Sequence, residues 1–410
     1  MTLSLPLQIL IAMLFGLLLG VALPEAAPWV EPLGAIFIAA LKMLIAPLVF
    51  LSIVTGVTAL GDWSRLGKLG GVALLYYFST TALAVVVGML VVGIMQPGVG
   101  SELTLPTPEA ATIHPPEGLG AFLNQQIPKI FDNPIHALSS GNILGMIAFA
   151  LLFGLGLLAV GERGKGVVEA LDGANAAVLK VTDWVMALAP IGIFALVAGI
   201  VAQTGIEVLR PMAAYVATVL LALGLHWGLV LPLILRLVGG MGWGRFLKGG
   251  SPAMLVAWST ASSSATLPVT LECAEKNLNV RPTTAGFVLP LGATVNMDGT
   301  ALYEAVAALF IAQLYGIDLS FGQQILVFLT ASLAAVGAAG IPGAGLVTMA
   351  MVLSAVGLPL EGIALLLAVD RLLDAFRTAT NVTGDLIGAV VVDRYAPGGG
   401  LSAKPQPENS

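Results

Sequence analysis

The segment DRLLDAFRTATNVTGD, Asp370–Asp385, carries five regularly spaced polar side chains inside a longer apolar stretch. They recur at steps of four, three, four and four residues: Asp370, Asp374, Arg377, Asn381 and Asp385. At about 100° per residue, all five fall within one sector of about 80° on a helix. The spacing therefore predicts a helix with one polar face.

The rest of the chain is strongly apolar, which indicates a membrane protein. Of 410 residues, 58% are hydrophobic and 10% are charged, whereas soluble domains carry about 25% charged residues. Apolar runs of roughly the 20 residues that a membrane span requires recur along the chain: Leu5–Leu23, Ile36–Leu60, Val72–Met95, Ile143–Val160 and Met212–Leu235. The first run is expected to be a retained helix rather than a signal peptide, because no Lys or Arg precedes Lys42.

Basic residues in the predicted loops orient the chain. With a cytoplasmic N-terminus, the outside loops contain only Lys129 and Arg210. The inside loops then contain the remaining loop cations: Arg65, Lys68, Arg163, Lys165, Arg236, Arg245, Lys248, Lys276, Arg281 and Arg394. This asymmetry satisfies the positive-inside rule and predicts a multi-pass protein of the cell (inner) membrane with both termini in the cytoplasm. The net charge of −6, without basic clusters, argues against nucleic-acid binding.

Two apolar segments are interrupted at matching places. Gly242–Lys276 is broken at Ser259–Ser264, and Gly322–Val356 is broken at Gly337–Gly345, GAAGIPGAG. Each half is too short to cross a bilayer, so helical hairpins that enter and leave on the same side are expected. Paired interruptions of this kind mark the binding site of many transporters. The alternative is that the small residues only permit close helix packing.

The charges on the polar face indicate a ligand. An ionised side chain at the bilayer centre costs about 2.5–3.5 kcal/mol on insertion scales. The face holds three Asp and one Arg, and the surplus carboxylates require a cation, although a self-compensating salt-bridge ladder is the alternative. Arg377 suits a carboxylate and Asp374 an ammonium group, as in an amino acid. Asn381 and Asp385 offer hard oxygens for an alkali cation or a proton.

Three further motifs are expected near this face. Asn296–Thr300, NMDGT, is expected to unwind a helix and to expose carbonyl groups, with a simple kink as the alternative. Tyr77–Thr81 places several hydroxyls at membrane depth, and Ser262–Ser264 falls at the first hairpin tip. Glu304, Lys42 and Lys180 are single intramembrane charges, for which partnered structural roles or snorkelling are expected rather than substrate contact.

Several functional classes have no support in the sequence. There is no phosphate-binding P-loop for ATP-driven transport and no nucleophile–base arrangement, so the chain is not expected to be an enzyme. His114, His136 and His226 lack neighbours at metal-ligand spacing.

Four motifs closely resemble the glutamate/aspartate transporter family, the dicarboxylate/amino acid:cation symporters. They are SSSATLPVT (Ser262–Thr270), LPLGATVNMDGTALY (Leu289–Tyr303), GAAGIPGAG (Gly337–Gly345) and DAFRTATNVTGD (Asp374–Asp385). The resemblance implies an all-α membrane protein with eight transmembrane helices, two re-entrant hairpins and inverted repeats, assembled as a homotrimer and working as an elevator. It implies scaffold helices in 1–70 and 101–240, the latter with an outer loop. Transport-domain segments would lie in 71–100 and 241–395, and 396–410 would be a disordered tail.

The resemblance also implies the site residues. The acidic amino acid would be bound by Ser263, Thr300, Ile341, Gly345, Asp374, Arg377, Thr378 and Asn381. Co-transported sodium ions would occupy three sites: one at Gly292, Asn296, Asn381 and Asp385, a second at Tyr77, Thr80, Thr81, Asn296 and Asp298, and a third near Thr294, Met297, Val336 and Ala338.

One feature departs from the family pattern. Members carry an arginine beside the pocket at a position that is Ala261 or Ala375 here, and Arg371 could supply that charge from a shifted position. The expected function is sodium-coupled uptake of L-aspartate or L-glutamate. A proton-coupled relative, a C4-dicarboxylate symporter and a neutral amino acid transporter are the alternatives within the same class. A channel or a membrane receptor is the alternative from a different class.

Overall fold

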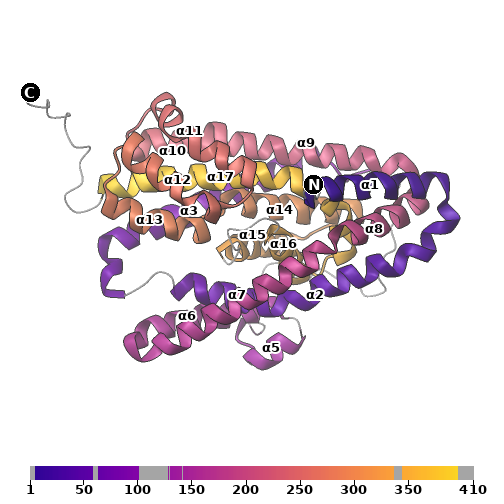
Figure 1. Ribbon diagram of the computed structural model, residues 1–410, viewed down its shortest axis with the longest axis horizontal. Coiled ribbons are helices and arrows are strands. Elements are labelled where there is room, and N and C mark those ends of the chain that lie inside the picture. The colour runs from indigo at the N-terminus through magenta and orange to yellow at the C-terminus, as the bar shows by residue number, and fades with distance from the viewer. Residues whose placement is uncertain are drawn as a thin grey trace, which may run out of the picture.

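The computed structural model describes residues 5–58, 63–100, 128, 130–140, 142–336 and 344–395. Within these ranges every regular element is helical, which confirms the all-α prediction, and the helices form an elongated bundle (Figure 1). The predicted tail, residues 396–410, and most of the predicted outer loop lie outside the described residues, apart from the short helix α5 (Pro134–Ser140).

The N-terminal helices pack on one another through apolar faces. They are α1 (Leu5–Ala22), α2 (Ala27–Thr58), α6 (Ile143–Val160), α7 (Lys165–Ala187) and α8 (Ala189–Thr204). In Figure 1, α8 runs obliquely between α1 and α2, and it packs against both. This group contains no charged side chain among its buried described residues, as expected for a scaffold that faces lipid.

Two glycines allow α1 to approach α8 closely. A Cβ atom added at Gly16 would lie 2.5 Å from the carbonyl oxygen of Phe194, and one at Gly20 would lie 2.8 Å from that of Ala198. The two helices therefore touch through their backbones, the packing that small residues permit in membranes.

The C-terminal helices contain the predicted interruptions. α11 (Trp243–Thr260) and α12 (Ser263–Glu272) are separated at residues 261–262, and α13 (Pro282–Val295) and α14 (Asp298–Leu314) at residues 296–297. α15 (Phe321–Val336) and α16 (Ala344–Val356) pack against each other, as do α11 and α12. The connection between α15 and α16, residues 337–343, lies outside the described residues.

The uninterrupted helix α17 (Ile363–Tyr395) is the centre of this second group. It packs against α11, α13, α14 and α3 (Trp63–Met95), and also against α9 (Leu209–Leu225). α9 continues through two π-helical stretches, His226–Val230 and Leu235–Gly239, so its direction changes little while its register shifts.

Length and composition alone identify three continuous spans in the described residues: Leu69–Met95, Gly145–Ala187 and Ala189–Gly239. A fourth is formed if the pair Leu7–Ala22 and Pro24–Ala40, bent by 113°, counts as one. Charged helices such as α17 fail this test although they are long enough. The eight-span count therefore stays a prediction.

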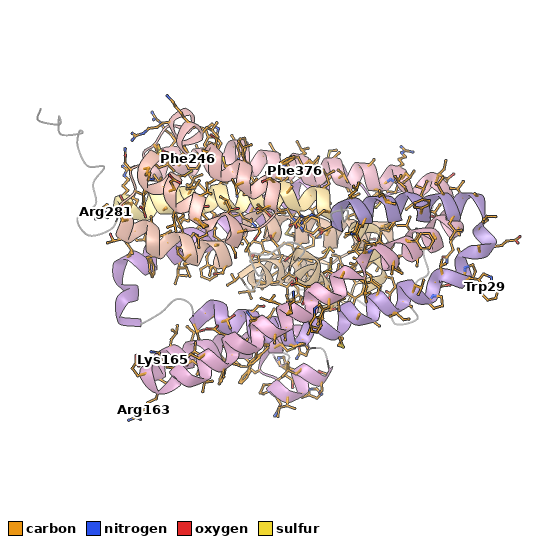
Figure 2. The ribbon with its side chains drawn as sticks, in the orientation of Figure 1. Trp29, Arg163, Lys165, Phe246, Arg281 and Phe376 are labelled. Atoms are coloured by element: carbon orange, nitrogen blue, oxygen red, sulfur yellow. The ribbon has the colours of Figure 1, made fainter. Side chains whose placement is uncertain are left out.

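The two ends of the bundle differ in character. Arg163, Lys165 and Arg281 lie at one end, and Trp29, 86% exposed, lies at the other (Figure 2). Cations at one end and an exposed tryptophan at the other agree with a bundle that crosses a bilayer end to end.

Substituting Gly16 with leucine should destabilise the protein, because the new side chain would overlap the α8 backbone. We expect a loss of about 1–3 kcal/mol, typical of overpacking, seen as a lower thermal midpoint in detergent. Gly199→Leu on α8 is the matched control, because nothing lies within 4 Å of its Cβ position. Equal midpoints for the two variants would contradict the close packing.

Candidate functional site

The polar face of α17 is directed into the protein. Asp370, Asp374, Arg377, Asn381 and Asp385 are all exposed by 7% or less. Since α17 is continuous through this segment, the five side chains lie along one line inside the bundle. The face is therefore an internal polar seam and not a lipid-facing surface.

Arg377 organises the first half of the seam. Its Nη2 atom lies 2.8 Å from Oδ1 of Asp374 and 3.0 Å from Oδ1 of Asp370. The guanidinium also lies 4.0 Å from the ring centre of Tyr303, a cation–π contact. Its remaining nitrogens, Nε and Nη1, are buried without a hydrogen-bond partner. Buried donors of this kind are costly, so they mark a place where an acceptor can bind.

The second hairpin reaches the unpartnered Nη1 atom of Arg377. A Cβ atom at Gly345 would lie 2.7 Å from Nη1 of Arg377, so only glycine leaves room there. Gly345 is in the first turn of α16, the end of a helix that favours an anion. Ile341 and Ala338, two further predicted site residues of this hairpin, lie outside the described residues.

Arg371 changes the charge balance inferred from the sequence. Its Nη1 atom lies 3.4 Å from Oδ2 of Asp374, although Arg371 is outside the 80° sector and its side chain is 32% exposed. Two acids and two arginines therefore meet at this end of the seam, and the salt-bridge ladder considered from the sequence describes this half. The carboxylates without an arginine or lysine partner among the described residues, Asp385 and Asp298, lie in the other half of the seam.

The break between α13 and α14 brings polar groups to the second half. Asn381 accepts a hydrogen bond from the backbone N–H of Gly299 (2.7 Å), and its amide donates to Oγ1 of Thr300 (3.3 Å). A Cβ atom at Gly299 would lie 2.6 Å from the carbonyl oxygen of Arg377, so the two helices approach through their backbones. The NMDGT motif thus interrupts a helix, as predicted, at the level of the seam.

Asp385 lies in a cluster of neutral oxygen and amide groups. Its Oδ1 atom accepts a hydrogen bond from Nδ2 of Asn296 (3.0 Å). A Cβ atom at Gly292 would lie 2.5 Å from the same oxygen and 2.8 Å from the hydroxyl of Tyr77. The hydroxyl of Tyr77 donates to the carbonyl oxygen of Val288 (2.7 Å). A carboxylate and nearby neutral oxygens form a donor set that suits a hard cation.

Asp298 lies in a second such cluster, formed with α3. It is fully buried and accepts a hydrogen bond from Oγ1 of Thr81 (2.8 Å). The hydroxyl of Thr80 lies 3.3 Å from Oδ1 of Asn296, so Asn296 connects the two carboxylate clusters. The predicted first and second ion sets are thus each brought together in part.

The third predicted ion set is brought together less completely. Met297 reaches the seam, with its sulfur 3.2 Å from Nδ2 of Asn381. Thr294 instead donates its hydroxyl to the carbonyl of Leu291, and Val336 is the last residue of α15.

The first hairpin ends in a capped turn. Ser262 accepts a hydrogen bond from the N–H of Ala265 and so caps α12, while Ser263 is buried. Ala261 has a positive φ of 51°, a left-handed conformation that is uncommon for a residue other than glycine. This turn brings the serines into the interior, since α11 and α12 both pack against α17.

The comparisons with known proteins agree with this arrangement. The model of the sodium:dicarboxylate symporter family matches residues 5–395. The chain belongs to the sodium:dicarboxylate symporter family. It is therefore a multi-pass membrane protein of a transporter family, as the sequence predicted.

This symporter is similar to both animal and bacterial relatives. It is 42% identical to excitatory amino acid transporter 3 of Mus musculus over 88% of this chain and 78% of the relative. It is 36% identical to the C4-dicarboxylate transport protein of Bacillus subtilis and to the proton/sodium-glutamate symport protein of Geobacillus stearothermophilus, each over 95% of this chain and 93% of the relative.

Sequence reasoning missed His226 of this symporter. Its Nε2 atom lies 3.2 Å from Oδ2 of Asp298, and both side chains are fully buried. His226 lies in the π-helical continuation of α9, 72 residues before Asp298. Spacing along the chain carries no signal for such a pair. The one available signal was the imidazole of His226 in an otherwise apolar helix, because a buried polar side chain requires a hydrogen-bond partner.

Replacing His226 with alanine should weaken sodium binding, because Asp298 loses the group that orients its second oxygen. Loss of such an outer contact costs about 10–100-fold in metal affinity, and we expect a rise of that order in the sodium concentration for half-maximal uptake. The control is Trp227→Phe, which removes the neighbouring hydrogen bond to Thr383. A sodium response that is equal in both variants would exclude this role.

Proposed function

We propose that this symporter is a secondary active transporter that takes up L-aspartate or L-glutamate together with sodium ions. The observation that carries the proposal is the geometry at Arg377. Its Nε and Nη1 donors are buried without a partner, and guanidinium N–H groups bind carboxylates through charge-assisted hydrogen bonds. Asp374 lies 2.8 Å from the same guanidinium and offers a partner for an ammonium group.

An acidic amino acid would use both charges at once. Its side-chain carboxylate would accept a hydrogen bond from an unpartnered donor of Arg377, and its ammonium would compete with Arg371 for Asp374. Uncharged groups around this pair would complete the pocket: Ser263, Thr300, Gly345, Thr378 and Asn381. All five are buried.

Sodium ions would neutralise the second half of the seam. Asp385 and Asp298 are buried carboxylates without a Lys or Arg partner among the described residues. A co-transported cation supplies the missing charge, and this dependence would couple the ion gradient to substrate binding.

We extend the proposal to the architecture. The seam is built from α3 and α11–α17, the segments assigned to a moving transport domain. The scaffold of a homotrimer would be formed by α1, α2 and α5–α9, including the continuation of α9 that carries His226. His226 is the one scaffold contribution among the seam contacts named above. An elevator movement would have to break its contact with Asp298. The cell membrane, with both termini cytoplasmic, is the proposed location.

Proton coupling is the second candidate, and one residue favours it. Glu304 is fully buried in α14, and neither carboxylate oxygen has a hydrogen-bond partner among the described residues. Thr348 and Arg377 are the polar groups that act on Glu304, so the structural role expected from the sequence stays a prediction. Buried intramembrane carboxyl groups are found in the proton relays of transporters.

The two coupling modes are separated by uptake into proteoliposomes. Labelled L-aspartate is offered under an inward sodium gradient, and separately under an inward proton gradient without sodium. We expect concentrative, saturable uptake with sodium. Uptake driven by protons alone would favour the Glu304 alternative, and non-saturable flux would indicate a channel.

Arg377→Ala should abolish uptake of acidic amino acids. Removing one partner of a buried, hydrogen-bonded charge pair costs about 2–5 kcal/mol, or roughly 30-fold or more in affinity. Arg281→Ala, which breaks an ion pair with Asp393 away from the seam, serves as the control. Undiminished aspartate uptake by Arg377→Ala would refute the pocket assignment.

Asp385→Asn should weaken the sodium dependence of uptake. The substitution keeps the size of the side chain but removes the charge that attracts the cation, so half-maximal sodium should rise about tenfold or more. Asp393→Asn, on the same helix, should leave it unchanged. Identical sodium curves for wild type and Asp385→Asn would exclude Asp385 as an ion ligand.

A further inference from the structure

A large apolar cavity lies apart from the polar seam. Its volume is about 470 Å³, it is open on one side, and it is lined by α1, α8, the start of α9 and the start of α17. Its wall includes Leu17, Val201, Met212, Val216, Leu365 and Val369. This volume is within the range of about 300–1,000 Å³ that ligand pockets occupy.

The chemistry of the wall restricts the occupant to an apolar molecule. Every residue that lines the cavity is Ala, Val, Leu, Ile or Met, so a polar guest would find no side-chain partner there. Water is excluded for the same reason, because apolar cavities stay dry. A void of this size would also cost its lining atoms many dispersion contacts.

The cavity opens beside exposed apolar side chains. Leu14 and Leu209 line it while remaining 56% and 47% exposed. On α1 the exposed strip continues with Phe15 and Leu18, at 60% and 58%. Exposed apolar side chains on a membrane helix contact acyl chains, so the lipid phase is the nearest source of an apolar guest.

A cation lies beside the same opening. Arg210 follows Leu209 in the first turn of α9, is exposed, and forms no ion pair among the described residues. On a helix it lies about 60° from Ala213, another lining residue, so it flanks the cavity face. A guanidinium in this place suits a phosphate group.

We propose that the cavity binds one acyl chain of a bilayer phospholipid whose phosphate pairs with Arg210. The site is independent of the substrate pocket, although Val369 in its wall is followed directly by Asp370 of the seam. A lipid bound there would join α1, α8 and α9 to the helix that carries the polar seam.

The test is photolabelling of the full-length protein in phosphatidylcholine/phosphatidylglycerol vesicles. A trace of phosphatidylglycerol with a diazirine in one acyl chain is the probe, and labelled peptides are mapped by mass spectrometry. We expect adducts on the cavity residues of α1, α8 and α9. Adducts spread evenly over lipid-facing helices would overturn the proposal. The proposal would also be overturned if the cavity residues were not labelled because residues 101–127 or a second copy of the chain cover them.

Variants sharpen the result. Ala213→Phe should fill the cavity and reduce its labelling about tenfold, since losing contacts with two methylene groups has this effect. Ala217→Phe is the control, because Ala217 is exposed on the same helix and does not line the cavity. Equal labelling in the two variants would overturn the acyl-chain site.

Arg210→Gln tests the headgroup contact. Labelling by the phosphatidylglycerol probe should fall severalfold, whereas labelling by a diazirine diacylglycerol without phosphate should not change. A parallel loss for both probes, or none for either, would overturn the role of Arg210. The thermal midpoint of each variant in detergent confirms that it is folded.

Discussion

Burial of carboxylates at membrane depth is the constraint on which this structure depends. An ionised acid there is costly unless a cation compensates it. The protein meets the constraint in two ways along α17. Arg377 contacts both Asp370 and Asp374 directly, and Arg371 contacts Asp374. Further along, Asp385 and Asp298 are held mainly by neutral donors, which orient the carboxylates without cancelling their charge. The protein's own arginines therefore compensate the carboxylate charges in the first half of the seam, whereas bound cations would have to compensate them in the second half.

The local backbone follows from the same constraint. The helix break at Asn296–Met297 supplies amide and hydroxyl groups at the depth where α17 carries Asn381 and Asp385. Gly292 and Gly299 are needed because side chains at these positions would occupy the space of the carboxylate or of the α17 backbone. The glycines and the helix breaks thus serve the same purpose, because together they let backbone polar groups face the seam and not the lipid.

Much of this arrangement was predictable from sequence, since it depends on local patterns. The polar face follows from spacing on one helix, and the breaks at Ser259–Ser264 and NMDGT from residues that disfavour helix. Two contacts were not predictable. The sequence suggested a charge from Arg371, but not its partner Asp374, which it reaches through the length of its side chain from another sector. His226 meets Asp298 through the packing of a distant helix, which no spacing rule encodes.

The central claim is that external cations complete the buried charge balance and thereby permit substrate to bind. It is tested most directly by measuring the dissociation constant of L-aspartate for the purified protein by calorimetry, as sodium is replaced stepwise by choline at constant ionic strength. The account predicts that the affinity for aspartate falls steadily as sodium is withdrawn, because the two ligands are linked through the seam. A dissociation constant that is the same in sodium and in choline would contradict it.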